Sequence, residues 1–466
     1  MFLLSLFYIC AAIGSSLGFE GIFWHISDIH LNVSFNLGNN RWYGDYKNDA
    51  SFPLVHSAIK AMKTIYHNPL FIIWNGDNAY HRIANRSNFL ESLKNVSSEI
   101  RFYFPNANIL PTLGNHDVNP SSLFNANSTW CEELLIFWKD FVNSSENETK
   151  RFLKGCFYSR TIKSGNDTVK IIVLNSMLWY RHNKLVKDER DPLSQFSWLM
   201  NELEEAAMKK QRVFVVSHIP PGASEFSPKK FRFFHSKFNK RFLEILQNYS
   251  NIIDAGFFGH QHVDAFKIVY DTQGKPKIPL FLSPSVSPLH LKGLGSINPS
   301  IRLFFWNSSL SNCKYQQYHT TIPNELNNTK NNTLNWILEY DSKTLYSGLS
   351  AEDLDNFSLD LSKDNSIYFE RFFTYHLSGR SHDSGASNNS TIRCQIVCGL
   401  RNIDYTNLDK CLVKCSDESS TFWMIIGIVI ASFLLALAGF VIGSVILLRR
   451  KTFNGNSSYK FTIEQL

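Results

Sequence analysis

The sequence predicts an α/β fold: a layered domain of strands and helices, then a small, mainly helical domain that contains disulfides, and one transmembrane helix. Three observations predict this organisation. Short β-branched and aromatic runs alternate with longer amphipathic runs over residues 21–290, as they do in layered α/β domains. After residue 310 the alternation stops, and Asn, Ser and clustered cysteines become frequent. Near the end of the chain, a long stretch carries no charged residue, which is typical of a membrane-spanning helix.

The first domain is expected over residues 19–310. Its strand-like segments, in chain order, are GIFWHIS, LFIIWN, NILPTL, VKIIVLN, RVFVVS and IIDAGFF. Its segments with helical spacing are FPLVHSAIKAMKTIYH, QFSWLMNELEEAAMKK and FRFFHSKFNKRFLEILQNY. The last of these interleaves cations with aromatic residues, which would also suit a membrane or a nucleic acid. Its spacing favours an ordinary amphipathic helix whose core face is formed by Phe231, Phe234, Phe238, Phe242 and Leu246.

The second domain is expected over residues 311–418, with helical fragments in AEDLDNFSLDLSKD and SIYFERFFTYHL. Four cysteines cluster near its end, and two more flank a helical segment of the first domain: Cys394, Cys398, Cys411, Cys415, Cys131 and Cys156. The C-x3-C spacing does not match a zinc ribbon, so disulfides are expected in an oxidising compartment, with their connectivity open. Cys313 is left over without an assignment.

Both ends of the chain indicate the secretory pathway. Residues 1–18 are apolar and close on small residues, as a cleaved signal peptide does. Residues 421–448 are long enough to cross a bilayer of about 30 Å. Residues 449–451 are basic, which by the positive-inside rule places the tail, residues 449–466, in the cytoplasm. We therefore expect a single-pass type I membrane protein whose bulk is extracellular or lumenal, at the cell surface or in endolysosomes.

The region between the two apolar segments is rich in N-glycosylation sequons, which agrees with that location. Twelve of them begin at Asn85, Asn95, Asn127, Asn143, Asn147, Asn166, Asn248, Asn307, Asn327, Asn331, Asn356 and Asn388. Another begins at Asn32, but it lies close to the candidate site described next, and we expect no glycan there. The formal charge of +7, from 47 basic and 40 acidic residues, is small and not gathered in one block, so no nucleic-acid polymer is expected as a partner.

Polar residues that form strands poorly follow five of the predicted strands, in the blocks DIH, GDNAYH, GNHD, SHIPPG and GHQH. The carboxyl ends of strands in an open α/β sheet are where ligand sites assemble, so we expect these blocks to meet. Glycines at 76, 114 and 259 would let the chain turn sharply and its backbone approach a ligand. The candidate donors are two carboxylates, one amide and four imidazoles: Asp28, His30, Asp77, Asn115, His218, His260 and His262.

This set of nitrogen and oxygen donors contains no thiolate and suits borderline divalent metals such as Zn²⁺, Mn²⁺ or Fe²⁺. A single catalytic zinc needs only about three protein ligands, so the set is large enough for two metals if one carboxylate bridges them. Each block alone has an ordinary explanation, because a lone histidine is more often a core or surface residue and Gly-Asp usually marks a turn. Their joint position at strand ends favours the metal site.

The five blocks resemble the signature of the calcineurin-like metallophosphoesterase superfamily. The segments SHIPPG, FFGHQHVDAF, WLMNELEEA and LSPSVSPLHLKGLGSINPSIRLF are more closely similar to the acid sphingomyelinase-like phosphodiesterases, over about residues 21–310, with a looser similarity in the cysteine-rich region. The resemblance implies a β-sandwich flanked by helices and two divalent metals, most often Zn²⁺. Sphingomyelinase proper carries an N-terminal saposin-type domain. Here the first block begins ten residues after the predicted signal, so the chain resembles the branch without that domain.

By position, the resemblance implies that one metal is held by Asp28, His30, Asp77 and His262, and the second by Asp77, Asn115, His218 and His260. It places His116 and His81 as catalytic residues near the leaving group and the phosphoryl oxygens, where a protonated imidazole can donate to the departing oxygen. Tyr80 has the spacing of the tyrosinate ligand of purple acid phosphatases. Those enzymes lack a histidine at the position of His30, so we do not expect tyrosinate ligation.

The sequence therefore predicts an enzyme, a metal-dependent phosphodiesterase that hydrolyses extracellular or lumenal phosphodiester or nucleotide phosphoanhydride substrates by attack of a metal-bound hydroxide. One alternative is a sphingomyelin phosphodiesterase that releases phosphocholine and ceramide, since a membrane anchor would keep the enzyme near phospholipid. An alternative of another class is an inactive surface receptor on a phosphoesterase scaffold. The complete donor set argues against the receptor, because a buried cluster of carboxylates and imidazoles without a function is costly.

Overall fold

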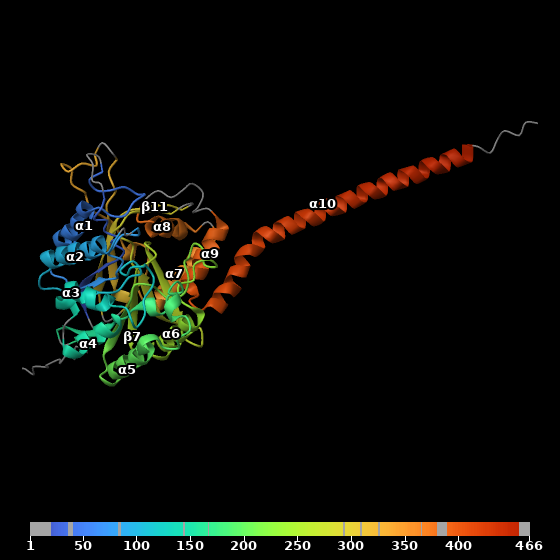
Figure 1. Ribbon diagram of the computed structural model, residues 1–466. Helices are drawn as coiled ribbons and strands as arrows, with labels where there is room; N and C mark the ends of the chain where they lie inside the picture. Colours follow the sequence, from blue (N-terminus) through green and yellow to red (C-terminus); the bar gives the residue numbers. More distant parts are fainter. Residues whose placement is uncertain are drawn as a thin grey trace, which may run out of the picture. The chain divides into compact units, whose positions relative to one another are not determined.

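The computed structural model describes residues 20–455, apart from 36–40, 83–84, 143–144, 166, 292–293, 308–309, 325–326, 365 and 380–388. Two six-stranded sheets form the centre of the fold, and helices cover them (Figure 1). This is the layered α/β sandwich that the sequence predicts. The expected signal peptide and residues 456–466 of the expected tail lie outside the described residues.

The first sheet has the strand order β14-β13-β12-β1-β2-β3. Its strands are β1 (Gly21–Ile26), β2 (Phe71–Trp74), β3 (Asn108–Pro111), β12 (Ser300–Trp306), β13 (Lys314–His319) and β14 (Ile337–Asp341). Strands β1, β2 and β3 run parallel, and β12 to β14 extend the sheet from β1 by antiparallel pairing. The carboxyl ends of β1, β2 and β3 therefore meet at one edge of the sheet.

The second sheet has the order β4-β5-β6-β7-β9-β8. Its strands are β4 (Tyr158–Ser164), β5 (Asp167–Val173), β6 (Arg212–Val216), β7 (Ile253–Phe258), β8 (Ala265–Tyr270) and β9 (Pro276–Leu282). The four inner strands are parallel, and β4 and β8 close the sheet as antiparallel edges. A separate hairpin consists of β10 (Leu289–Leu291) and β11 (Gly295–Ile297).

Aromatic side chains fill the space between the two sheets. Phe23 of β1 packs against Phe257 of β7, with ring centroids 5.5 Å apart. Phe304 of β12 lies 5.3 Å from Phe281 of β9, again between ring centroids, and all four side chains are buried. Large aromatic rings bury much apolar surface, so this layer contributes strongly to stability. It also fixes β1 of one sheet against β7 of the other, which determines where their ends lie.

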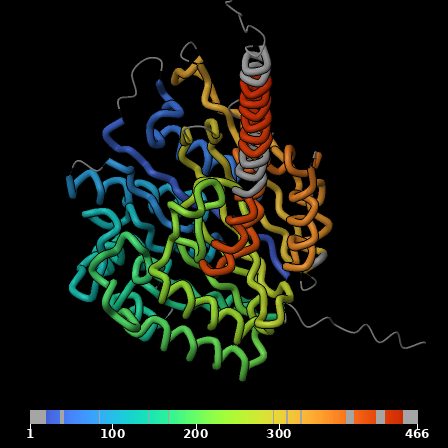
Figure 2. The backbone as a smooth tube through the Cα atoms, turned by 90° about the vertical axis from the view of Figure 1, so that its right-hand side faces the viewer, coloured from blue at the N-terminus to red at the C-terminus, as the bar shows by residue number. Residues whose placement is uncertain are grey.

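Helices cover the outer faces of both sheets. The helices of the described chain are α1 (Phe52–Ile65), α2 (Arg86–Tyr103), α3 (Trp130–Val142), α4 (Glu146–Gly155), α5 (Gln195–Met208), α6 (Ser236–Asn248), α7 (Ala351–Ser362), α8 (Ile367–His376), α9 (Ser390–Arg401) and α10 (Tyr405–Gly455). Helices α1 and α3 contact the first sheet, and α5, α6, α7 and α9 contact the second. In Figure 2 the cyan helices α2 and α3 and the orange helices α7 and α8 stand on opposite sides of the molecule.

The expected elements of the first domain are present. The six strand-like segments form β1, β2, β3, β5, β6 and β7, and the three helical segments contain α1, α5 and α6. The expected aromatic face was wrong at one end. Helix α6 begins at Ser236, so Phe231 and Phe234 both lie before it. Phe231 has 46% of its surface exposed, whereas Phe234, Phe238 and Phe242 are buried as predicted.

The segment after residue 310 contains helices α7 and α8, as expected, and also two strands that were not expected. Strands β13 and β14 continue the first sheet beyond residue 310. The sequence does not predict them because both are short and rich in polar residues. In β13, KYQQYH, only alternate residues are buried. The domain boundary at residue 310 stays a prediction.

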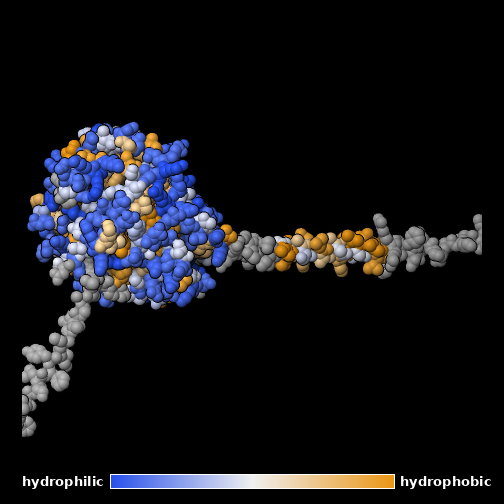
Figure 3. All heavy atoms as spheres, turned by 90° about the horizontal axis from the view of Figure 1, so that it is seen from below, coloured by the Kyte–Doolittle hydropathy of each residue, from blue (hydrophilic) through white to orange (hydrophobic). Residues whose placement is uncertain are grey.

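Helix α10 is the apolar C-terminal helix. Within it, Gly427–Leu447 has a mean hydropathy of 2.6, and it is the one helix among the described residues that is long and apolar enough to cross a membrane. Apolar side chains cover this stretch on the face shown in Figure 3. Residues from Leu412 onwards form a unit of their own, separate from the unit that ends at Cys411.

The expected disulfides are present. Cys131 of α3 bonds to Cys156 at the end of α4, and Cys398 of α9 bonds to Cys411. Cys394 and Cys415 are disulfide-bonded as well. Cys313 is buried, and its Sγ donates to the Asn307 carbonyl at 3.1 Å. The cysteine cluster is therefore a set of disulfides and not a zinc site.

Candidate active site

The seven candidate donors lie directly after five parallel strands, three of the first sheet and two of the second. Asp28 and His30 follow β1, Asp77 follows β2, Asn115 follows β3, His218 follows β6, and His260 and His262 follow β7. Because the aromatic layer holds the two sheets face to face, the strand ends bring these side chains into two groups with one member in common.

The first group contains Asp28, His30, Asp77 and His262. Nε2 of His30 lies 3.1 Å from Nε2 of His262, 3.6 Å from Oδ2 of Asp77 and 3.8 Å from Oδ1 of Asp28. Nε2 of His262 is 3.3 Å from Oδ1 of Asp28. All four side chains are buried, and ligand atoms of Asp28, His30 and Asp77 all lie within 4.8 Å of one another.

The second group contains Asp77, Asn115, His218 and His260. Nε2 of His218 lies 3.2 Å from Oδ2 of Asp77 and 3.1 Å from Oδ1 of Asn115. Ligand atoms of Asp77, His218 and His260 all lie within 4.8 Å of one another. Oδ2 of Asp77 therefore takes part in both groups, which is the position of a bridging carboxylate.

Hydrogen bonds to the backbone orient the donors. His30 donates from Nδ1 to the Ala79 carbonyl at 3.0 Å, and His218 donates from Nδ1 to the Asn75 carbonyl at 2.5 Å. A carbonyl can only accept, so Nδ1 carries a proton and Nε2 faces the site, where the neutral imidazole has a lone pair for a metal. Asp28 and Asp77 each use one carboxylate oxygen to accept a backbone N–H, from His260 at 2.9 Å and from His116 at 2.7 Å.

The backbone at the site is strained. Five of the seven donors have a positive φ: Asp28 (52°), His30 (44°), Asp77 (53°), His260 (71°) and His262 (63°). L-residues rarely adopt this left-handed region, which costs each of them roughly 1 kcal/mol or more, and such strain clusters at functional sites. With a positive φ, the chain turns sharply after each strand. The donor side chains that follow the strand can therefore point toward the strand ends.

Gly259, directly after β7, lies close to the end of β1. A Cβ at this position would overlap the Ser27 hydroxyl and approach Oδ2 of Asp28 to 2.7 Å. We expect Gly259→Ala to destabilise the protein by about 3 kcal/mol, because overpacking would move Asp28. Thermal unfolding of the full-length protein in detergent measures this loss of stability.

The control is Gly274→Ala, at a turn with φ 79° and open space around its Cβ position. Only the cost of the positive φ, about 1 kcal/mol, is expected there. Equal losses in both variants would contradict the close approach.

The two carboxylates make the site strongly negative. Despite burial, nearby histidines hold the pKa values of Asp28 and Asp77 below their usual range. Burial opposes a charge on His30 and His218, but the carboxylates outweigh it and raise the pKa of each to about 9. Burial lowers the pKa values of His260 and His262 to about 3. The site therefore stabilises positive charge, as protons on imidazoles or as bound cations.

These residues fit metal ions better than they fit one another. Oδ1 of Asp28 is buried and has no hydrogen-bond partner among the described residues. The Nε2 atoms of His30 and His262 lie 3.1 Å apart, so two ring nitrogens are directed at the same place. Divalent cations would satisfy both features and displace the protons from the imidazoles. The Tyr80 hydroxyl accepts from Nδ2 of Asn88 of α2 at 3.2 Å.

The two expected catalytic histidines stand beside the first group. The rings of His81 and His30 stack with centroids 4.0 Å apart, and the His116 ring lies 4.4 Å from that of His81. Burial lowers the pKa of His116 to about 4, despite the Asp77 carboxylate. His81 is partly exposed at the mouth of the site.

Two residues support the site although the sequence analysis gave them no role. Asp49 accepts from Nδ1 of His81 at 2.6 Å and from its backbone N–H at 2.9 Å. Asp117 accepts the backbone N–H groups of Asp77 at 2.8 Å and Gly114 at 2.9 Å. Asp117 belongs to the GNHD block and could have been singled out. Asp49 lies in a loop before α1, where no pattern in the sequence indicates it.

Two clefts flank the donors. A polar cleft of about 720 Å³ contains His81 and Asp49 and carries the cations Lys47 and Arg82. An aromatic cleft of about 300 Å³ contains His260, Phe226, Phe231 and Phe233. The hairpin β10–β11 lies between them, since its residue 289 lines the polar cleft and its residue 291 lines the aromatic one. The cleft beside His81 thus carries two cations, whereas the cleft beside His260 is lined by aromatic rings.

Family models match most of the chain. The model of the calcineurin-like phosphoesterases matches residues 22–264, and that of the acid sphingomyelin phosphodiesterase C-terminal region matches residues 275–418. Acid sphingomyelinase-like phosphodiesterase 3b of Homo sapiens is 30% identical over 418 residues, which cover 84% of this chain and 90% of that protein.

Two other curated relatives carry different names. Cyclic GMP-AMP phosphodiesterase SMPDL3A of Rattus norvegicus is 29% identical over 84% of this chain and 92% of its own length. Sphingomyelinase phosphodiesterase C of Dictyostelium discoideum is 31% identical over 69% of this chain and 77% of its own length. A solved dimetal phosphatase of Danio rerio matches with a TM-score of 0.42 and 13% identity, over 64% of this chain and 94% of that one.

Proposed function

The chain belongs to the calcineurin-like phosphoesterases and, within them, to the acid sphingomyelinase-like phosphodiesterases, and on that premise we propose that it hydrolyses small phosphodiesters or nucleotide phosphoanhydrides at a site for two divalent metals. That it is a phosphodiester hydrolase follows from the family. The metal ligands, the catalytic residues, the substrate and the location of the protein are the proposal.

One observation supports the site above all others. A single buried carboxylate oxygen, Oδ2 of Asp77, stands 3.6 Å from Nε2 of His30 and 3.2 Å from Nε2 of His218. We assign Asp28, His30, Asp77 and His262 to the first metal, and Asp77, Asn115, His218 and His260 to the second. The metals, most suitably Zn²⁺ for this donor set, would acidify a water nucleophile and neutralise charge on the phosphoryl oxygens.

The protein's own groups would then protonate the leaving oxygen. His116 and His81 are the two imidazoles beside the site that are not needed as ligands. A neutral His116, as its lowered pKa implies, becomes a proton donor only when an anion raises that pKa. The negative phosphodiester supplies such an anion, so its binding would place the proton where the leaving oxygen needs it.

The clefts favour a polar leaving group over ceramide. His81, one of the two proposed acids, lines the polar cleft together with Lys47 and Arg82. A phosphate or nucleotide leaving there would keep its negative charge beside these cations. The aromatic cleft beside His260 can stack a base or accept an apolar group. That cleft is the feature that favours the second candidate, a sphingomyelin phosphodiesterase, and the names of the relatives include both activities.

For the location of the protein, we propose what the sequence predicts. The apolar stretch Gly427–Leu447 and the disulfides support a single-pass membrane protein whose catalytic part faces the lumen or the outside of the cell. An inactive receptor on this scaffold is disfavoured, since none of the seven donors is replaced.

A substrate panel with the full-length protein in detergent tests the function. ATP, CDP-choline, a cyclic dinucleotide and sphingomyelin are compared at equal concentration, before and after chelation and after Zn²⁺ or Mn²⁺ is restored. We expect turnover of the nucleotide substrates, loss of activity on chelation and its recovery with metal. Turnover of sphingomyelin alone would select the second candidate, and activity that survives complete chelation would overturn the metal mechanism.

Asp49 is expected to position His81. Its carboxylate is ionised, because the hydrogen bond from His81 outweighs burial and lowers the pKa of Asp49 to about 2. In Asp49→Asn the side chain is uncharged and has one oxygen in place of two, so it no longer accepts both N–H groups of His81 as a carboxylate does. Because the His81 ring is then less well oriented, kcat should fall by about 10-fold to 100-fold with KM nearly unchanged. The measurement is steady-state kinetics, and Asp45→Asn in the same loop is the control. A rise in KM alone would show that Asp49 acts on substrate binding and not on His81.

A further inference from the structure

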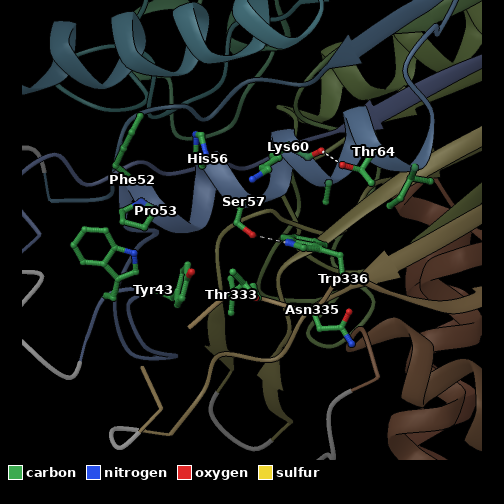
Figure 4. Close-up of a pocket in the computed structure, with 14 residues that line it drawn as sticks. Tyr43, Phe52, Pro53, His56, Ser57, Lys60, Thr64, Thr333, Asn335 and Trp336 are labelled. Atoms are coloured by element: carbon green, nitrogen blue, oxygen red, sulfur yellow. Dashed lines mark hydrogen bonds between the residues drawn. The ribbon is translucent and has the colours of Figure 1, made fainter. Parts of the chain in front are cut away.

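A groove lies along the outer side of α1 (Figure 4). Its volume is about 590 Å³, and it is lined by α1, the loop before it and the segment 333–336. The lining residues that bear on its ligand are Trp42, Phe52, Ser57, Thr64, Asn335 and Trp336. None of them belongs to the donor groups or to the two clefts of the active site, so the groove is a separate feature.

Aromatic rings and small polar groups share this lining. Phe52 exposes 40% of its surface, although it is a large apolar side chain. The indole of Trp336 is held in place because Nε1 donates to Oγ of Ser57 at 2.9 Å (Figure 4). Hydroxyl groups of α1, the hydroxyl of Thr333 and the amide of Asn335 surround the rings, together with the imidazole of His56 and the ammonium group of Lys60. Among the described residues, no carboxylate lines the groove.

This combination suits a carbohydrate. A sugar ring offers a C–H face that packs on an aromatic ring, and hydroxyls that bond to groups such as those of Thr64 and Asn335. An acyl chain would contact the rings but leave the polar groups without a partner on the ligand.

The chain itself has an attachment site for a carbohydrate at the end of the groove. Asn331 begins the sequon Asn-Asn-Thr, is exposed, and lies two residues before Thr333, which lines the groove. Two residues span at most about 7 Å. The loop that carries Asn331 is fixed, since the Tyr43 hydroxyl donates to the Asn332 carbonyl at 2.5 Å and Nδ2 of Asn328 donates to the Gly44 carbonyl at 2.7 Å.

We propose that this groove holds the innermost sugars of an N-linked glycan on Asn331, packed against Trp336 and Trp42. The inference rests on the proposed lumenal location, where such glycans are added. A tethered glycan has a high effective concentration at the groove, so weak contacts between sugars and rings are enough to keep it there. The glycan covers an aromatic surface that would otherwise face solvent.

Site-resolved deglycosylation tests this. The full-length protein is produced in a eukaryotic host, treated with peptide-N-glycosidase under native conditions, and sampled over time by glycopeptide mass spectrometry. We expect the Asn331 glycan to be released about tenfold more slowly than the glycan on Asn147, an exposed residue of α4, which corresponds to about 1.4 kcal/mol of groove contact. Both sites are expected to be released at equal rates after denaturation.

Two variants separate groove binding from general shielding. Trp336→Ala removes a contact ring, and Thr64→Trp fills the groove from an exposed position of α1. Both should abolish the tenfold difference while hydrolase activity stays unchanged, which also shows that they fold. Three outcomes would each overturn the proposal. They are equal native release at Asn331 and Asn147 in the wild type, slow release at Asn331 that persists in both variants, and an Asn331 without a glycan in a chain that is glycosylated elsewhere. A chain without glycans at any sequon would overturn the lumenal location and this inference, whereas metal-dependent hydrolysis would remain.

Discussion

Asp77→Asn should abolish most of the activity and the metal content together. The substitution keeps the shape of the side chain and an acceptor for the His116 backbone N–H, but it removes the negative charge that both donor groups share. We expect kcat/KM on bis-p-nitrophenyl phosphate to fall by about 10³-fold or more, because loss of the bridging ligand weakens both metals at once. Kinetics and metal analysis by mass spectrometry of the same preparation measure the two effects.

The matched control is Asp254→Asn, another buried aspartate. Asp254 belongs to β7 but bonds to Arg212, with Oδ1 at 2.7 Å from Nε, and takes no part in the site. Its metal content and activity are expected to stay within about twofold of the wild type, even if stability falls. An Asp77→Asn protein that retains two metals, or that retains activity after losing them, would show that Asp77 is not the bridging ligand.

His116→Ala should have the second largest effect, and one that depends on the leaving group. A proposed general acid matters most when the departing oxygen is strongly basic. We expect kcat to fall by about 10²-fold to 10³-fold with a substrate that releases an alkoxide, and by about 10-fold or less with one that releases p-nitrophenolate. Steady-state kinetics with the two kinds of substrate measure the difference.

Metal content distinguishes an acid from a ligand in this experiment. His116→Ala should keep the metals of the wild type, because neither donor group contains His116. His67→Ala, at an exposed histidine, serves as the control and should change neither quantity. Equal losses with both leaving groups would assign His116 to the phosphoryl oxygens, and a loss of metal would make it a ligand.

The candidate site could be predicted from the sequence because its chemistry is local. Each block, such as Asp28 and His30 after β1 or His260 and His262 after β7, stands next to an apolar run whose type and length identify a buried strand. Strands β13 and β14 could not be recognised in this way, because β13 buries only alternate residues and the edge strand β14 is mostly exposed or half-buried, so both resemble polar loops. Phe231 was misplaced because helical spacing continues in the sequence before Ser236, where the helix begins.

The sequence by itself determined which side chains are available: seven nitrogen and oxygen donors, two further histidines, and the glycines that allow close approach. Only the tertiary structure decided which of them meet. The packing of Phe23 against Phe257 sets one sheet on the other, and this brings His30 within reach of His262, 232 positions away. Asp49 became a partner of His81, and Asn331 the neighbour of a groove, for the same reason. Contacts between residues distant in the chain depend on how whole sheets and loops pack, and no short segment carries that information.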